Sequence, residues 1–247
     1  MTTHAEPQLT PSSLYPGQRP PPGSWRTWLC IGGWGAGKTH AVSMAVIAEA
    51  MADPEAHILM VGSSSTDVLQ RQIGIDARDS RSSSILALAP PAFRPTVRLA
   101  RRALTFPNGA RVQWASAWNP DGLRGFSCSL VCARDLSHWG RDALAALEEC
   151  RRAARHQTSR MCQLGLPARL FLTSRAAPTA LLHNAVEASD ALVRTRLSTL
   201  DNSHHLEPRL VEQARKLRHT VAGRRDFEGE LYFSPEEYEE NAPPLAV

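Results

Sequence analysis

The sequence predicts an α/β domain in which a mostly parallel β-sheet is flanked by helices on both faces and carries a β-hairpin insertion. Two observations favour this fold class. Short apolar segments alternate with helical patterns between residues 25 and 218, which is typical of a parallel sheet covered by helices. A glycine-rich loop from Gly32 to Thr39 also separates the first apolar segment from the first helical pattern.

The apolar segments and turn residues place the strands. We expect strands at residues 27–31, 57–61, 103–106, 111–114, 129–133, 170–173 and 191–194. Each is a short apolar or alternating run bounded by turn-forming or polar residues. Between residues 103–106 and 111–114 stands the dipeptide Asn108-Gly109. This pair predicts a hairpin closed by a type I′ turn.

Helical spacing of apolar residues places the helices. We expect helices at residues 41–52, 67–73, 141–156, 178–188 and 207–218. The first is rich in Ala, Met, Val and Ile and ends at Asp53-Pro54, because proline cannot continue a helix. The last presents Leu210, Val211, Ala214 and Leu217 on one face, as an amphipathic helix does.

Composition divides the chain into four regions. Residues 1–24 hold six prolines and little apolar material, so we expect an extended arm. Residues 25–200 would form the core, 201–235 a helical linker subdomain and 236–247 a flexible acidic tail.

Several protein classes are excluded by composition. The 247 residues are 43% hydrophobic and 21% charged, which suits a soluble globular protein. No apolar run approaches the roughly 18 residues needed to cross a bilayer, and the N-terminus carries no secretory signal. Five cysteines without a C-x-x-C pair indicate reduced cytosolic thiols and no zinc site.

Basic residues gather in the middle of the chain. Residues 94–160 hold 12 arginines and five acidic residues, whereas residues 226–240 hold seven acidic residues and no basic ones. A basic middle suits a polyanion such as nucleic acid. Only Lys38 and Lys216 are lysines, and a GC-rich genome is sufficient to explain that bias.

The glycine-rich loop has the pattern of a phosphate-binding loop. Gly32-x-x-x-x-Gly37-Lys38-Thr39 follows a predicted strand and opens a predicted helix, as a P-loop must. Its glycines allow backbone N–H groups to point at a β-phosphate, and the helix N-terminus favours negative charge. Lys38 would reach the β- and γ-phosphates, and the Thr39 hydroxyl would bind Mg²⁺. The sequence therefore predicts a P-loop NTPase that binds a nucleotide through the eight loop residues Gly32, Gly33, Trp34, Gly35, Ala36, Gly37, Lys38 and Thr39.

Beyond this loop, the sequence resembles the ATPase domain of phage large terminase subunits, and most closely the branch that includes gene transfer agents of alphaproteobacteria. The resemblance begins at Ser24-Trp25-Arg26-Thr27-Trp28-Leu29, runs into the P-loop, and covers most of residues 16–232. It continues through residues 89–91, 101–110, 123–125 (Leu-Arg-Gly), 172–174, 201–202 and 227–231.

The resemblance implies a DNA-packaging motor and an ASCE-type P-loop fold. Such motors use ATP and Mg²⁺ to drive double-stranded DNA into a capsid. They work as rings in the host cytoplasm, with a portal protein and a small terminase subunit. Gln18 would then bind adenine, with a solvated loop residue as the alternative. Thr173-Ser174 would form the coupling motif, with a polar strand end as the alternative. Arg124 would contact the nucleotide of a neighbouring subunit.

The P-loop and the Walker B segment depart from the family pattern. The family has Arg at the position of Trp34, where the cation is thought to stabilise charge on the transferred phosphate. Its Walker B strand ends in Asp-Glu, and Arg134-Asp135 stands there. Asp135 would activate the attacking water, or, if the register slips by one residue, would bind Mg²⁺ with Thr39 and leave no catalytic acid. We expect that Arg134 does not take the role of the arginine that the family has at the position of Trp34. We therefore expect slow or absent hydrolysis, dependent on Asp135, Lys38 and Arg124.

The third departure concerns the nuclease. The RNase H-like nuclease of the family is missing from the sequence, so we expect no nuclease activity and a separately encoded nuclease partner. DNA contacts have four candidates beside the hairpin, Arg98, Arg101, Arg102 and Arg111, with a solvated hairpin face as the alternative.

Three function hypotheses follow. The first is a terminase-type motor ATPase, and the second is a non-hydrolysing pseudo-ATPase that binds nucleotide or DNA. The third, a helicase-type ATPase, is disfavoured by the ordered matches from Arg101 to Gly125 and by the lack of a second RecA-like domain.

Overall fold

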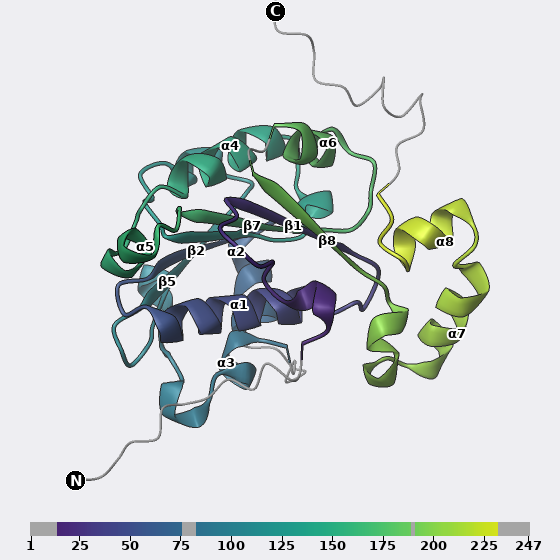
Figure 1. Ribbon diagram of the computed structural model, residues 1–247, viewed down its shortest axis with the longest axis horizontal. Coiled ribbons are helices and arrows are strands. Elements are labelled where there is room, and N and C mark those ends of the chain that lie inside the picture. Colours follow the sequence, from purple (N-terminus) through teal and green to yellow (C-terminus); the bar gives the residue numbers. More distant parts are fainter. Residues whose placement is uncertain (1–13, 76–82, 189–190, 232–247) are drawn as a thin grey trace, which may run out of the picture.

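The computed structural model describes residues 14–75, 83–188 and 191–231, and in them one eight-stranded sheet organises the molecule (Figure 1). The strand order is β3-β4-β5-β2-β6-β7-β1-β8. The strands are β1 (Thr27–Gly32), β2 (His57–Gly62), β3 (Thr96–Arg98), β4 (Ala103–Thr105), β5 (Arg111–Ser116), β6 (Leu130–Ala133), β7 (Arg169–Ser174) and β8 (Leu192–Leu197). Residues 1–13, which begin the expected arm, and the expected acidic tail at 236–247 lie outside the described residues.

The sheet confirms the predicted fold class. In spatial order, β5, β2, β6, β7, β1 and β8 each pair in parallel with the next strand, and β3, β4 and β5 pair antiparallel at one edge. Strand β7 lies between β1, which leads into the P-loop, and β6, which leads into Arg134-Asp135. Since parallel strands all end at the same edge, these three strand ends are brought together.

Helices cover both faces of the sheet. They are α1 (Lys38–Ala52), α2 (Ser65–Asp67), α3 (Ile85–Leu88), α4 (Ala143–Ala153), α5 (Ser159–Leu164), α6 (Ala180–Glu187), α7 (Pro208–Leu217) and α8 (Val221–Asp226). In Figure 1, α1 and α3 lie on one face and α4 and α6 on the other, while α7 and α8 lie beyond β8. Among the described residues, no helix is long and apolar enough to cross a membrane.

Alternation along β1 supplies both halves of the core. Trp28 and Cys30 are buried on the α1 side, and Leu29 and Ile31 are buried on the α4 side, because successive side chains of a strand point to opposite faces. The Trp28 ring stacks on Phe171 of β7 with centroids 3.8 Å apart. Strand β1 is therefore held from both faces, which fixes the position of the loop that follows it.

The hairpin turn differs from the expected type. The Gly109 N–H donates to the Phe106 carbonyl at 3.0 Å, and the Phe106 N–H donates to the Ala110 carbonyl at 2.9 Å. Gly109 has φ +104°, whereas Asn108 is not in the positive-φ region, so the type I′ prediction is wrong. The reason is Pro107: a two-residue loop needs an N–H at that position, which proline lacks. The chain instead makes a three-residue loop ending in a left-handed glycine.

Most expected elements are present with shifted ends. The helix expected at 67–73 begins earlier, as α2 capped by Ser64, and continues as a π-helical turn, η3 (Val68–Ile73). The helix expected at 141–156 is shorter and occupies Ala143–Ala153. Helices α5 and α8 and strand β3 were not predicted, because each spans at most six residues and shows too little periodicity.

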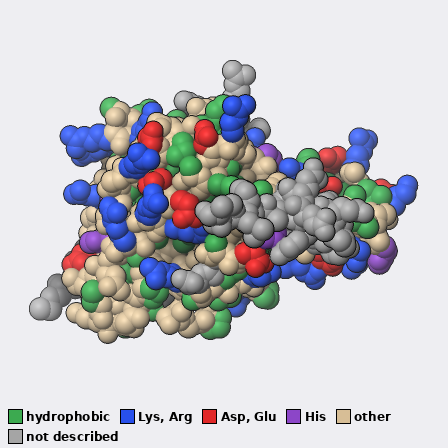
Figure 2. All heavy atoms as spheres, turned by 90° about the horizontal axis from the view of Figure 1, so that it is seen from above, with side chains coloured by type: hydrophobic (Ala, Val, Ile, Leu, Met, Phe, Trp, Pro, Cys, Tyr) green, Lys and Arg blue, Asp and Glu red, His purple; other side chains and the backbone are tan. Residues whose placement is uncertain are grey.

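Part of the basic middle of the chain is paired with acids on the α4 face. Arg152 lies 2.6 Å from Glu149, and Arg124 lies 3.1 Å from Asp121 and 3.7 Å from Glu149. Figure 2, which looks onto this face, shows blue and red side chains intermixed, with the α7–α8 part standing out at the right. This face therefore offers no uninterrupted basic surface.

Candidate nucleotide-binding site

The glycine-rich loop adopts a strand-loop-helix geometry. Strand β1 ends at Gly32 and α1 begins at Lys38, with Gly37 as its N-cap at φ +87°. A Cβ at Gly37 would lie 2.2 Å from the Gln18 Nε2 atom, so both the backbone angle and the packing require glycine. The first N–H groups of α1 have no intrahelical acceptor and form an anion-binding end.

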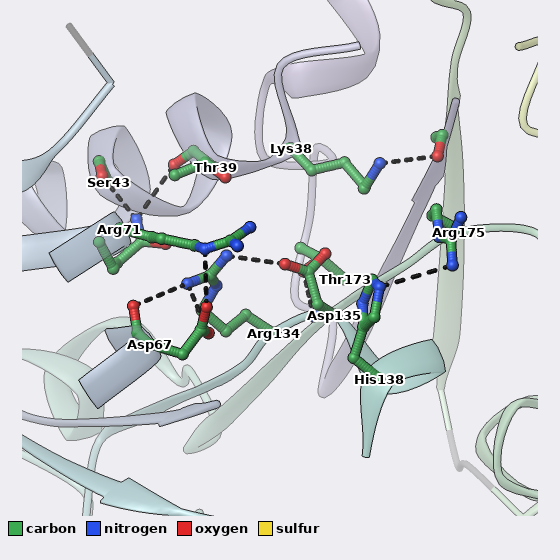
Figure 3. A network of polar contacts seen from close by, with 12 residues as sticks. Lys38, Thr39, Ser43, Asp67, Arg71, Arg134, Asp135, His138, Thr173 and Arg175 are labelled. Carbon is green, nitrogen blue, oxygen red and sulfur yellow. Dashed lines mark hydrogen bonds and ion pairs between the residues drawn. The ribbon is translucent and has the colours of Figure 1, made fainter. Parts of the chain in front are cut away.

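Lys38 lies across the loop that precedes it (Figure 3). Its Nζ atom donates to the carbonyls of Gly32 at 2.7 Å and Gly33 at 2.8 Å. Burial lowers the pKa of Lys38, while the Asp135 carboxylate acts in the opposite direction and favours the charged form. The ammonium is thus held at the loop by carbonyls that an incoming phosphate can replace.

A cavity of about 710 Å³ opens beside the loop. Residues 34–39 of the loop line it together with Arg71, Arg134, Asp135, His138, Arg175 and Asn202, among others. Ligand pockets in proteins are commonly 300–1,000 Å³, so a nucleotide fits. A second cavity, of about 660 Å³, lies beside the hairpin, away from the loop.

The strand end next to the loop carries a buried ion-pair network. Arg134, 2% exposed, directs one guanidinium nitrogen to Asp67 Oδ2 at 3.0 Å and the other to Asp135 Oδ2 at 2.7 Å. Arg71 also bonds to Asp67, at 3.0 Å. Burial raises the pKa of Asp135, but the charges of Arg134, Lys38 and His138 outweigh it and hold that pKa below its usual value. Asp135 is therefore a carboxylate facing a cationic surrounding (Figure 3).

The register at this strand end distinguishes Arg134 from Asp135. The Arg134 N–H continues the sheet ladder and donates to the Val61 carbonyl at 2.8 Å. Asp135 follows with φ +51°, in the left-handed region. The arginine thus occupies the last ladder position, and the carboxylate reaches the cavity from the residue after it.

Among the cavity residues that sequence reasoning missed are Arg175 and His138. The Arg175 guanidinium lies 5.3 Å from the centre of the Trp34 ring, a cation–π distance. An Arg175 nitrogen also lies 3.5 Å from His138 Nε2. Trp34, 52% exposed, thereby brings a cation to the loop although it has none itself. The only signal in the sequence was that Arg175 directly follows Thr173-Ser174.

Gln18 and Thr173 are both hydrogen-bonded to the backbone of site residues. Gln18 is 2% exposed, so it is not a solvated loop residue. Its Nε2 atom donates to the carbonyls of Gly37 at 3.3 Å and Ala36 at 3.4 Å. Gln18 does not line the cavity, and its contact with adenine stays a prediction. The Thr173 hydroxyl accepts the Asp135 N–H at 3.1 Å, which joins the expected coupling motif to the carboxylate.

The candidate DNA contacts divide into two groups. Arg98, Arg101 and Arg111 line the second cavity. Arg102 instead directs its Nη1 atom to the Ser65 hydroxyl at 3.4 Å. Arg124 lies on the α4 face and lines neither cavity.

The segment after β8 closes over the outer side of the loop. The Trp34 N–H donates to the Asp226 carbonyl at 2.8 Å, and its carbonyl accepts the Thr199 hydroxyl at 2.7 Å. Asn202 donates to the Gly35 carbonyl at 2.7 Å. The linker region is therefore hydrogen-bonded to the backbone of the phosphate-binding loop.

The donors present do not fit Mg²⁺. Magnesium needs oxygen ligands in near-octahedral geometry. Thr39 lines the cavity, but the carboxylates of Asp67 and Asp135 are both bound to Arg134. The described residues hold no cluster of three or more His, Cys, Asp or Glu side chains suited to a metal ion.

Comparisons with known proteins agree with this geometry. The family model described as "Terminase large subunit, T4likevirus-type, N-terminal" matches residues 29–231. The large terminase of a thermophilic bacteriophage in complex with ADP is similar in structure, with a TM-score of 0.59 at 15% identity. The match covers 85% of this chain and 49% of that one, so the chain spans about half the length of that terminase.

Two further solved structures are similar. The same phage terminase in complex with ATP-γ-S gives a TM-score of 0.57 at 15% identity, covering 85% of this chain and 48% of that one. The ATPase domain of the Thermus phage P74-26 large terminase gives 0.51 at 12% identity, covering 85% and 90%. No curated protein matches. Since the family model spans far more than half of the sequence, the chain belongs to the family of terminase large subunits and corresponds to their N-terminal part.

Proposed function

We propose that this chain binds ATP in the cavity beside the P-loop and serves as the ATPase part of a DNA-packaging motor, with slow or absent hydrolysis. The observation that carries the proposal is that the groups needed for nucleotide binding and hydrolysis line the same cavity. The loop residues from Trp34 to Thr39, the Asp135 carboxylate and the Arg175 guanidinium all line it. Anion-binding amides and a carboxylate able to orient water are what phosphoanhydride cleavage needs.

Each residue has a distinct part in this proposal. Lys38 leaves the carbonyls of Gly32 and Gly33 and binds the β- and γ-phosphates, as the lysine of a P-loop does. Asp135 orients the attacking water, and its low pKa keeps it ionised as a base. Its ion pair with Arg134 weakens it in that role, because a paired carboxylate accepts a proton less readily. No ligand is assigned to Mg²⁺ in this proposal, because both oxygens of Asp67 and one oxygen of Asp135 are bonded to arginine.

Coupling to movement is proposed to pass through two contacts. Thr173 bonds to the Asp135 N–H and so responds when that residue moves. Thr199, Asn202 and Asp226 bond to the loop backbone. A change in loop conformation on nucleotide binding would therefore shift the helices that follow β8. Two arrangements of such a hydrogen-bonded segment are sufficient for a switch.

DNA is proposed to contact the hairpin side of the molecule. Arg98, Arg101 and Arg111 line one cavity of about 660 Å³, which favours phosphate contacts over a merely solvated face. Arg102 is a weaker candidate because it bonds to Ser65. Binding should be insensitive to sequence and should weaken with added salt. Affinity for double-stranded DNA that does not change with salt would contradict this assignment.

The partners of such a motor follow from the family. We propose that copies of the chain form a ring at a capsid portal in the host cytoplasm, together with a small terminase subunit. A phage or a gene transfer agent would suit equally. Arg124 is 68% exposed and is proposed to reach the nucleotide of a neighbouring subunit.

A non-hydrolysing pseudo-ATPase is the second candidate, and two side chains favour it. Trp34 stands where the family has a cation, and Arg134 stands where it has an acid. Loss of either catalytic group typically reduces the rate by orders of magnitude.

Steady-state ATP hydrolysis with and without double-stranded DNA separates the two candidates. Turnover that DNA stimulates, and that Lys38→Ala and Asp135→Asn both abolish, would establish the motor ATPase. ATP binding that Lys38→Ala abolishes, without turnover under any condition, would establish the pseudo-ATPase. Absence of ATP binding by the wild-type protein would refute both.

A further inference from the structure

Arg134 stands at a strand end that normally presents an acid to a metal ion. Its N–H is fixed in the ladder by the Val61 carbonyl at 2.8 Å, and its side chain is 3% exposed and bonded to both Asp67 and Asp135. The Trp139 indole N–H donates to the Arg134 carbonyl at 2.9 Å. Both the backbone and the side chain of Arg134 are therefore fixed in place, and its positive charge is a fixed part of the cavity wall.

The charges around the cavity favour a polyanion that carries no metal ion. Among the described residues that line it, Lys38, Arg71, Arg134 and Arg175 are basic, and Asp135 is the acid. A triphosphate ordinarily reaches a P-loop with a divalent cation that neutralises part of its charge. Here four basic side chains face two carboxylates, Asp67 and Asp135, so the site keeps a net positive charge of its own that repels a metal ion.

The carboxylates that remain are largely engaged by arginine. Both oxygens of Asp67 are bonded, one to Arg71 and one to Arg134, and Asp135 directs its Oδ2 atom to Arg134. A divalent ion bound by both acids would have to compete with Arg134 for them. Arg134 is almost wholly buried, and breaking a buried ion pair leaves a charge without compensation.

We propose that the cavity binds a nucleoside triphosphate without a divalent cation, and that Arg134 supplies the positive charge in place of the metal ion. The inference rests on the proposed ATP binding and goes beyond it. Arg134 acts on the phosphate chain through its charge, and its two carboxylate partners hold the guanidinium in place. No covalent step is involved, and the proposal concerns affinity alone.

Calorimetric titration of the wild-type protein with ATP tests the proposal directly. One titration contains excess EDTA and the other contains excess Mg²⁺. The dissociation constant for ATP in EDTA should be no more than about threefold higher than with Mg²⁺. An affinity that falls more than about tenfold in EDTA would overturn the proposal while leaving ATP binding intact. No binding under either condition would instead refute the proposed function.

Variants of Arg134 give a second, independent readout. Arg134→Met retains the length of the side chain without its charge, and ATP affinity in EDTA should fall at least about tenfold. Arg134→Lys should retain much of it. Arg155→Met is the matched control: it removes an exposed arginine that lines neither cavity, and affinity should not change. Unaltered affinity in a folded Arg134→Met protein would overturn the proposal.

Restoring the acids gives the converse experiment. In Arg134→Asp/Asp135→Glu the two carboxylates of the family return, and ATP binding should become tighter with Mg²⁺ than with EDTA by about tenfold or more. Circular dichroism and thermal unfolding check that the variant folds. If it does not fold, the wild-type titrations with EDTA and Mg²⁺ still decide the question.

Discussion

Gly37 combines a left-handed backbone with a close contact, so replacing it should weaken both folding and nucleotide binding. Alanine there is strained by φ +87°, and its Cβ would meet Gln18 at 2.2 Å. We expect Gly37→Ala to lower the free energy of unfolding by about 1 to 3 kcal/mol and to abolish ATP binding. Urea denaturation and calorimetry measure the two effects.

Gly125 provides the control for Gly37. It has φ +89° with open space around it, so Gly125→Ala should cost only the backbone strain of about 1 to 2 kcal/mol, with ATP binding intact. Equal effects on ATP binding at the two positions would show that the loop is not the binding site.

Arg175 should strengthen ATP binding because it lines the cavity beside Trp34. A hydrogen bond from a charged donor contributes about 1.5 to 3 kcal/mol. Arg175→Met should therefore raise the ATP dissociation constant about tenfold or more, as measured by titration. Arg194→Met removes an exposed arginine from β8 that lines neither cavity and should have no effect. An Arg175→Met protein that binds ATP normally would leave the cation–π pair as a structural contact only.

At the scale of single residues, site residues whose positions a sequence motif dictates could be predicted. Site residues that tertiary contacts bring to the cavity could not. Lys38 and Thr39 could be placed because the P-loop spacing dictates their position. Arg175 could not be, because its approach to Trp34 depends on β7 lying next to β1, which no local pattern reports. The same holds for Asp67, which reaches Arg134 from helix α2.

At the scale of elements, Thr158 joins two helices, so its loss should lower the free energy of unfolding more than the loss of an ordinary helix cap. Its hydroxyl accepts the Met161 N–H at the start of α5, at 3.2 Å, and bonds to buried Asp53 at the end of α1. Thr158→Val removes the cap and leaves a carboxylate oxygen unpaired, so we expect a loss of about 2 to 3 kcal/mol in unfolding free energy.

Thr179 is the matched control, since it caps α6 through the Leu182 N–H at 3.2 Å and no bond from it to a buried acid is recorded. Thr179→Val should cost only the cap, about 1 kcal/mol. Chemical denaturation of both variants measures the difference. Equal losses would show that the Asp53 contact adds nothing.

Elements with a strong period were predictable and short ones were not. Apolar runs indicated β1, β2, β6 and β7 to within about two residues at each end, because buried parallel strands are continuously apolar. Helix α5 spans six residues, too few for a period to emerge. The hairpin was located correctly, but Pro107 changed the turn.

At the scale of the whole molecule, the strand order lies beyond local patterns. The insertion of β7 between β1 and β6 places Thr173 beside Asp135, and β8 pairs with β1 so that the chain returns to the P-loop. The linker region had been expected as a separate helical segment. Its hydrogen bonds to the loop backbone could not be predicted, since they depend on where β8 ends.

These contacts predict that ATP will order the linker as well as the loop. Asn202 lines the cavity and bonds to the Gly35 carbonyl, so bound nucleotide should slow amide exchange in both the loop and η8 (Leu200–His205). Exchange in α5, at the opposite end of the sheet from α7 and α8 (Figure 1), should not change. In Asn202→Ala the loop should still be protected by ATP, while η8 should lose most of its added protection. Ser203→Ala, beside it, should behave as wild type. Hydrogen–deuterium exchange read by mass spectrometry measures this, and η8 protection that survives Asn202→Ala would mean that the signal leaves the loop by another route, through Thr199 or Asp226.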